Sequence, residues 1–231
     1  MMASVEMQII AHIHNDFGTK FGLPRQSGLV EKLSSVIIFE PPYREAAAFR
    51  GIEDYSHLWL LWHFSEARKK NWSATVRPPR LGGNRRMGVF ATRSPYRPNP
   101  LGLSSVKLEK VVFDEKNGPM LYVSGADLMD GTPIFDVKPY LAFTDSHEDA
   151  RGGFASEIEP YQLEVDFPRE LLCRIPEEKR DMLCGVLAED PRPAYQEDPE
   201  RIYGLDFADR DIRFRVVENH LRVVDVIEKG K

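Results

Sequence analysis

The sequence is poor in cysteine. Its 231 residues include two cysteines, Cys173 and Cys184, and their spacing matches neither a zinc-binding pattern nor a disulfide framework. Both lie in a region predicted to be helical, where a free cysteine behaves as a small apolar residue. We therefore expect a reducing, cytoplasmic compartment and no bound metal.

Long apolar runs are missing as well. The longest one, Leu58–Trp62, is far too short to span a bilayer. The first residues, MMASVEMQII, lack the basic start and long apolar stretch of a secretory signal. With 42% hydrophobic and 29% charged residues the composition is that of a soluble globular protein. We expect no membrane partner, and one large domain with at most a small appendage.

Several motifs of nucleotide binding and covalent catalysis are absent. There is no GxGxxG or Walker sequence, and Ser94, Ser104 and Ser105 do not form a GxSxG elbow. His12 and His14 share one face of a predicted strand, but no third metal ligand is near them in sequence. A covalent mechanism is disfavoured, and a site that acts by positioning its reactants is favoured.

Acidic residues are absent from residues 67–108, although the whole chain has a formal net charge of -5. The stretch TVRPPRLGGNRRMGVFATRSPYRPNPLG, residues 75–102, carries instead the arginines Arg77, Arg80, Arg85, Arg86, Arg93 and Arg97. Its prolines fix φ and remove backbone donors, which predicts stiff loops. Guanidinium groups on stiff loops suit phosphate or carboxylate recognition. The alternative is a solvated positive face.

Turn residues divide the first 145 residues into short apolar segments, which predicts an all-β barrel or sandwich. We expect a short helix at residues 42–50 and place Trp59 and Trp62 in the core. The predicted strands are residues 8–15, 35–39, 56–64, 88–92, 103–113, 120–126 and 134–140. A polar linker, residues 146–158, precedes a small α+β domain, residues 159–231, with a strand at 161–167, a helix at 176–189, the segment DPRPAY at 190–195 and three further strands.

One predicted strand carries a polar face of mixed chemistry. In DGTPIFDVKPY, residues 130–140, alternation places Asp136, Lys138 and Tyr140 on one face. Such a set can order a proton acceptor, a point charge and a donor around a substrate. An ion pair on the surface beside a satisfied tyrosine explains the pattern equally well.

The segments VRPPRLGG (residues 76–83), GVFATRSPYRPNPLG (88–102) and DGTPIFDVKPY (130–140) resemble the signature of the TsaA-like, or TrmO, family. The resemblance covers nearly the whole chain. It implies a mainly β protein: a single-sheeted antiparallel β-barrel catalytic domain over residues 1–145 and, from 159 to 231, the C-terminal domain of the bacterial branch. It also implies a homodimer with the cofactor site near the subunit interface.

The resemblance further implies an enzyme that uses S-adenosylmethionine to methylate the exocyclic N6 of threonylcarbamoyladenosine, next to the tRNA anticodon. Carried over by motif, the cofactor contacts fall on Pro24, Arg25, Gln26, Ser65, Glu66, Arg93, Leu103, Asp130, Gly131, Thr132 and Pro133. Ser65 and Glu66 depart from the His-Gln pair of bacterial relatives. Contacts through the backbone would tolerate this change.

For catalysis we expect Asp136, Lys138 and Tyr140 to surround the reacting group, and Arg97 or Arg77 to hold the threonyl carboxylate. We assign Arg80, Arg85 and Arg86, with Lys69 and Lys70, to anticodon-arm phosphates. Two alternatives remain open: a non-catalytic RNA- or anion-binding barrel, and methyl transfer to a different substrate.

Overall fold

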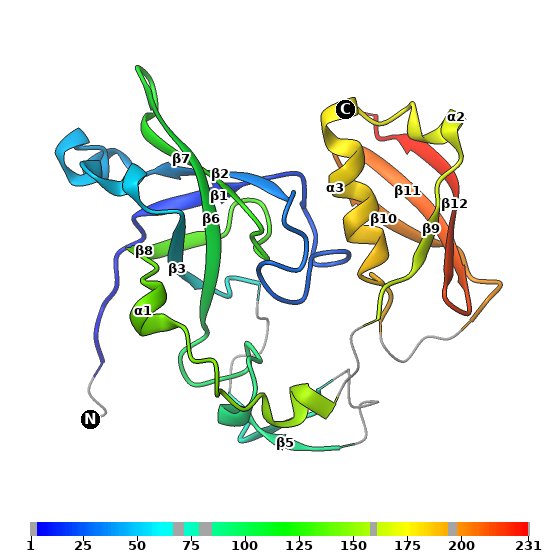
Figure 1. Ribbon diagram of the computed structural model, residues 1–231, viewed down its shortest axis with the longest axis horizontal. Coiled ribbons are helices and arrows are strands. Elements are labelled where there is room, and N and C mark those ends of the chain that lie inside the picture. Colours follow the sequence, from blue (N-terminus) through cyan, green and yellow to red (C-terminus); the bar gives the residue numbers. More distant parts are fainter. Residues whose placement is uncertain (1–3, 67–71, 79–84, 158–160, 194–197, 231) are drawn as a thin grey trace.

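The chain forms two β-rich units, shown in Figure 1 as a computed structural model that describes residues 4–66, 72–78, 85–157, 161–193 and 198–230. The first unit is a closed barrel with the strand order β1-β2-β7-β6-β3-β8, and every pair in it is antiparallel. Its strands are β1 Ala11–His14, β2 Ser34–Phe39, β3 His57–His63, β6 Leu101–Asp114, β7 Gly118–Ser124 and β8 Pro133–Pro139. The predicted mainly β, single-barrel fold is confirmed.

Alternating side chains fill the barrel. Ile13, Leu60, Leu121 and Ile134 have no exposed surface and belong to one core cluster. Because successive side chains of a strand point to opposite faces, each strand contributes to this interior with every second residue. The outward-facing Trp59 on β3 is only half-buried, so its predicted place in the core is wrong, whereas Trp62 is buried as expected.

Two predicted elements take a different form. The expected helix at 42–50 consists of two 3-10 turns, Pro41–Tyr43 and Ala46–Phe49. So short a segment gains little from helix propagation, and Phe49 is held by an edge-to-face contact with Phe39 in the barrel core. The expected strand at 88–92 is the short β5, Met87–Gly88, paired with β4, Thr75–Val76, and followed by a 3-10 turn over Val89–Ala91. Val89, the first residue of that turn, is buried.

The second unit is a four-stranded sheet on which the longer helix, α3, and the short helix α2 pack. Its strand order is β10-β11-β12-β9, with β9 parallel to β12. The elements are β9 Glu164–Asp166, α2 Arg169–Leu172, α3 Glu177–Ala188, β10 Tyr203–Phe207, β11 Arg210–Val217 and β12 His220–Glu228. Helix α3 starts after Pro176, a residue suited to a helix start, and buries Met182, Leu183, Val186 and Leu187 against the sheet. The connection between the units contains α1, Ala142–Asp145, and a 3-10 turn over Gly153–Glu157.

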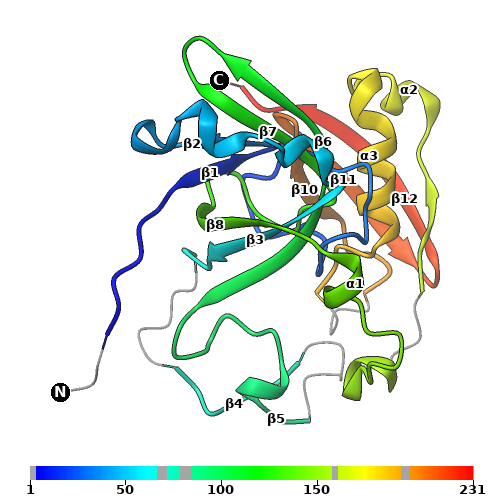
Figure 2. The same ribbon diagram turned by 60° about the vertical axis from the view of Figure 1, so that its left-hand side comes forward.

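The loop between β1 and β2, residues 17–33, leaves the barrel and lies against the second unit. Figures 1 and 2 show this blue segment beside α3 and β10. Phe17, Val30 and Leu33 are buried in the core of the second unit rather than in the barrel. The rings of Phe17 and Phe207 meet edge to face with centroids 5.4 Å apart. We call residues 17–33 the β1–β2 loop.

None of the helices in the described parts of the chain combines the length and the apolar character needed to traverse a lipid bilayer.

Two glycines of the β1–β2 loop allow a test of its packing. Gly22 and Gly28 both have positive φ, but a Cβ at Gly22 would lie 2.1 Å from Leu205, whereas a Cβ at Gly28 would meet nothing within 4 Å. Gly28→Ala is expected to lower the free energy of unfolding by about 1 kcal/mol through backbone strain alone. Gly22→Ala adds the clash and should lower it by about 2–3 kcal/mol. Urea denaturation measures both, and equal losses would contradict packing of the loop on β10.

Candidate functional site

Two adjoining cavities lie where the barrel, the β1–β2 loop and the second unit meet. The first has a volume of about 1020 Å³ and the second about 230 Å³. The residues that line both are Lys20, Leu23, Trp62, Phe64, Pro95 and Asp127. Arg192 and Pro193 of the second unit complete the wall of the first. Clefts of this size between units are common places for small-molecule and cofactor sites.

The residues that resemblance assigns to a cofactor converge on these cavities from distant parts of the chain. The first cavity is lined by Pro24, Arg25, Gln26, Arg93 and Leu103. The second is lined by Ser65, Glu66 and Thr132. Asp130 and Gly131 precede Thr132 in the turn before β8, and Pro133 is the first residue of β8; these three are not among the described residues that line either cavity. The contacts of this turn fix its position, since Asp130 accepts a hydrogen bond from the Asn15 backbone N–H and lies 3.2 Å from His14 Nδ1.

Ser65 and Glu66 lie where β3 ends, and both are exposed. The backbone carbonyl of Glu66 accepts a hydrogen bond from Lys20 Nζ of the β1–β2 loop at 2.5 Å. This contact is made to the backbone of Glu66 and therefore does not depend on its side chain.

Arg97 is the residue of the expected catalytic set that lines the first cavity, where it donates a hydrogen bond to the Thr92 carbonyl at 3.2 Å. Asp136 and Lys138 share one face of β8, as predicted, and form an ion pair of 2.8 Å between exposed side chains. The carboxylate of Asp136 raises the pKa of Lys138. In the part of the chain that the structure describes, neither Asp136 nor Lys138 is among the residues that line the two cavities.

Trp59 connects β8 to the cavity. Its indole lines the first cavity, packs on the Tyr140 ring at 5.4 Å and donates a hydrogen bond to Asp145 Oδ2 at 2.7 Å. In the barrel register Trp59 pairs with Lys138. Lys138 and Tyr140 therefore lie one side chain away from the cavity, beside Trp59.

The arginine-rich stretch divides between the cavity and the surface. Arg93 lines the first cavity and donates a hydrogen bond to the side-chain amide oxygen of Gln26, Oε1. Arg77, Arg85 and Arg86 are exposed on or beside the β4–β5 ribbon, and Arg86 donates two hydrogen bonds to Thr75 Oγ1. Arg80, Lys69 and Lys70 lie outside the described residues.

A polar chain at the floor of the cavities was missed by the sequence analysis. Trp62 Nε1 donates to Ser104 Oγ at 3.0 Å, and Ser104 Oγ donates to Asp127 Oδ1 at 2.5 Å. Gly102 permits the close approach of Trp62, because a Cβ there would lie 2.1 Å from the indole. Strand alternation could have grouped Gly102 with Ser104 on one face of β6, but it could not bring Asp127 to them.

Asp127 has an unusual environment for a carboxylate. Burial raises its pKa, and the hydrogen bond from Ser104 and the positive charge of Arg93 offset that rise only in part. Among the described residues it is also the carboxylate that lines both cavities. Carboxylates with a raised pKa in a cleft are typical of sites that transfer protons.

Comparison with known proteins agrees with this geometry. The model of the tRNA-methyltransferase O N-terminal domain matches residues 12–146, and that of the TrmO C-terminal domain matches residues 160–229. The chain belongs to the tRNA-methyltransferase O family. The first match spans the barrel strands from His12 onward and α1, and the second spans the sheet and helices of the second unit of this TrmO family member.

Full-length relatives support the membership in TrmO. The chain is 42% identical over 225 residues to a protein of Escherichia coli (strain K12) named tRNA (adenine(37)-N6)-methyltransferase, covering 94% of this chain and 95% of that one. It is 38% identical over 226 residues to RcsF of Pseudomonas aeruginosa, whose name proposes an S-adenosylmethionine-dependent methyltransferase, with coverage of 94% and 95%. A crystal structure of TrmO superposes with a TM-score of 0.78 at 33% identity, covering 97% of this chain and all of that one.

Asp127→Asn is expected to stabilise this TrmO family member at neutral pH, because it removes a charge whose burial is unfavourable. The pKa of Asp127 is raised in the folded state, so the penalty is absent below the unfolded-state pKa of about 4 and fully present above the folded-state pKa. Thermal melts between about pH 4 and about pH 8 should show the advantage of the variant growing with pH. An advantage that shrinks as pH rises would contradict this environment.

Proposed function

We propose that this protein is an S-adenosylmethionine-dependent tRNA methyltransferase that methylates the exocyclic N6 of threonylcarbamoyladenosine next to the anticodon. The observation that carries the proposal is the convergence of the motif residues Pro24–Gln26, Arg93, Leu103 and Thr132 on two adjoining cavities. A barrel without a GxGxxG turn must bind its cofactor by such separate segments rather than at one helix N-terminus.

The residues present fit this cofactor. A cavity of about 1020 Å³ accommodates a nucleoside with an amino-acid side arm. Trp62 and Phe64, with ring centroids 4.2 Å apart, present aromatic surface that suits an adenine ring or a sulfonium cation. Arg93 and Arg25 supply donors for a carboxylate. When bound, S-adenosylmethionine supplies an already activated methyl group.

The protein must then orient the acceptor nitrogen and remove its proton. We assign the proton to the carboxylate of Asp127, because this group lines both cavities and Ser104 fixes its orientation. Arg97 at the cavity wall is placed to hold the threonyl carboxylate. Lys138 and Tyr140, with Asp136 paired to Lys138, position the substrate from the side of Trp59.

The exposed arginines fit an RNA substrate. Arg77, Arg85 and Arg86 lie on or beside the β4–β5 ribbon, away from acidic residues in sequence, and we assign them, with Arg80, to anticodon-arm phosphates. The affinity for tRNA should therefore fall steeply as salt is added, and the rate of methylation at a limiting tRNA concentration should fall with it.

The proposal extends to organisation and location. We propose a catalytic domain over residues 1–145, a linker over 146–158 and a C-terminal domain over 159–231, since the barrel ends at Pro139 and the second sheet begins at Glu164. We further propose a homodimer that acts on tRNA in the cytoplasm.

Two matched carboxylate variants test the assignment of the proton. Asp127→Asn should lower kcat by at least about 100-fold while the Kd for S-adenosylmethionine stays within a few-fold, since a general base acts on the chemical step. Asp136→Asn should lower kcat less. The assay is mass spectrometry of nucleosides from threonylcarbamoyladenosine-containing tRNA, with calorimetric titration of the cofactor.

The same measurements separate the alternatives. Cofactor binding without methylation of this tRNA would point to another substrate. RNA binding that is indifferent to S-adenosylmethionine would favour the non-catalytic barrel. Full methylation by both Lys138→Ala and Arg97→Ala would refute the roles given to those residues.

A further inference from the structure

The β1–β2 loop, which carries five residues that line the first cavity, is packed into the C-terminal unit. Phe17, Val30 and Leu33 are buried in the core that α3 and its sheet build. Pro24, Arg25 and Gln26 lie between these anchors and line the first cavity. Because protein cores are packed at crystal-like density, such anchors leave the loop backbone little freedom. The C-terminal unit thus limits where the cavity residues of the barrel unit can lie.

Ion pairs join both ends of this loop region to α3. Asp16 Oδ1 lies 2.6 Å from Lys179 Nζ, and both side chains are less than one-third exposed. Lys32 Nζ lies 2.5 Å from Asp181 Oδ2, but these side chains are well exposed. Exposed pairs contribute little to stability, so the Asp16–Lys179 pair is the stronger constraint.

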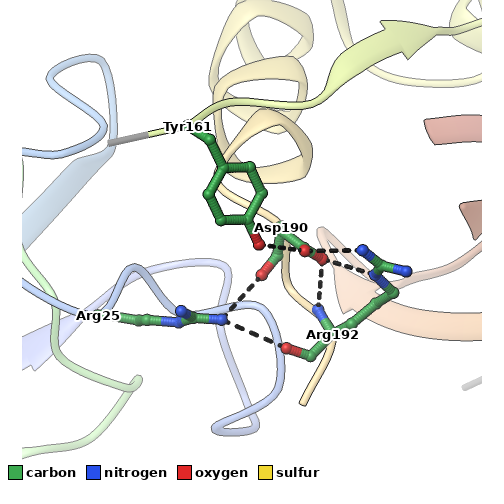
Figure 3. A network of polar contacts seen from close by, with 4 residues as sticks. All are labelled: Arg25, Tyr161, Asp190 and Arg192. Atoms are coloured by element: carbon green, nitrogen blue, oxygen red, sulfur yellow. Dashed lines mark hydrogen bonds and ion pairs between the residues drawn. The ribbon is translucent and has the colours of Figure 1, made fainter. Parts of the chain in front are cut away.

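A polar cluster around the buried carboxylate of Asp190, shown in Figure 3, is the third feature of the C-terminal unit that bears on this loop. Arg192 donates two side-chain hydrogen bonds to the Asp190 carboxylate, of 2.8 Å from Nε and 2.9 Å from Nη2, and Tyr161 donates a third of 2.6 Å from its hydroxyl. Asp190 is 5% exposed and has a φ of 49°. Few residues other than glycine adopt this left-handed conformation, and aspartate does so more readily than most because its side chain can bond the local backbone, as Asp190 Oδ1 does with the Arg192 N–H. We call Tyr161, Asp190 and Arg192 the Asp190 cluster.

Asp190 and Arg192 form an ion pair in which each group favours the charged form of the other. Burial raises the pKa of Asp190, but the hydrogen bonds from Arg192 and Tyr161 outweigh burial and leave that pKa below its usual range. The same carboxylate raises the pKa of Arg192. A two-pronged arginine–carboxylate pair of this kind fixes geometry as well as charge.

Arg25 joins the cavity to this cluster. Its Nη2 donates to the backbone carbonyls of Asp190 and Arg192, each at 3.4 Å, and Figure 3 shows its guanidinium reaching both. The two carbonyls can face the same donor because the side chains of Asp190 and Arg192 hold the turn between them. Arg25 and Arg192 both line the first cavity.

We propose that the Asp190 cluster is a positioning element of the cofactor site: it sets the place of Arg25 at the wall of the cavity, so that the C-terminal unit takes part in binding S-adenosylmethionine. This inference rests on the proposed function of the cavity. Its basis is the unbroken series of contacts from Tyr161 through Asp190 and Arg192 to Arg25.

A double-mutant cycle on the full-length protein tests the proposal. S-adenosylmethionine is titrated calorimetrically into wild type, Asp190→Asn, Arg25→Lys and the double variant. Each single change should weaken the Kd about tenfold, as expected for the loss of hydrogen bonds made by charged groups. Asp190→Asn should have little further effect in the Arg25→Lys background, because both changes break the same series of contacts.

A matched control is available in the same unit. Asp211 and Arg213 are also two residues apart and form an ion pair of 3.1 Å, but they lie on β11 and are not among the residues that line the cavities. Asp211→Asn should leave the Kd for S-adenosylmethionine unchanged. If Asp190→Asn melts below the assay temperature, Arg192→Lys replaces it, since lysine keeps the charge but loses the two-pronged geometry.

The outcomes separate this inference from the proposed function. A wild-type protein without measurable affinity for S-adenosylmethionine would refute the function of the cavity. Wild-type binding that Asp190→Asn or its substitute leaves unchanged would refute the positioning role alone. Additive effects of Asp190→Asn and Arg25→Lys would refute the route through Arg25, and lost tRNA affinity with unchanged cofactor affinity would assign the cluster to RNA instead.

Discussion

The packing of the β1–β2 loop into the core of the C-terminal unit is the contact on which the rest of the site depends. Phe17 meets Phe207 there, and Val30 and Leu33 are buried beside α3. A loop of this length on a free barrel would have many conformations and a correspondingly large entropic cost of ordering. Its anchors remove that cost from ligand binding, so Pro24, Arg25 and Gln26 are arranged before any ligand arrives.

The floor of the cavities follows a second constraint, which is that buried polar groups need partners. Trp62, Ser104 and Asp127 satisfy one another in a chain that spans β3, β6 and the segment before β8. Burial raises the pKa of the carboxylate at its end, so its charged form is unfavourable there, and the packed barrel core supplies stability that offsets this cost. The family membership and the cavity geometry both agree with a methyltransferase whose parts are spread over the whole chain.

Much of the barrel could be predicted because its information is local. The β6–β7 hairpin follows almost entirely from two local signals. These are the alternation of apolar and polar residues over 103–113 and the turn at Asn117–Gly118. Trp59 was wrongly placed in the core because the apolar character of residues 56–64 does not reveal whether the outward face of that strand is covered by other parts of the chain. Asp127 was missed because its hydrogen-bond partner Ser104 lies 23 residues away in the sequence. Arg192 was missed because its partner Arg25 belongs to the other unit. The roles given to Asp136, Lys138 and Arg97 stay predictions.

The most direct test is a crystal structure of the full-length protein with S-adenosylmethionine or its demethylated product. The account predicts ligand density in the first cavity, in contact with the β1–β2 loop at Arg25 or Gln26, with Arg192 still paired to Asp190 at the wall. Density at a site that contacts neither the β1–β2 loop nor the floor at Asp127 would contradict it.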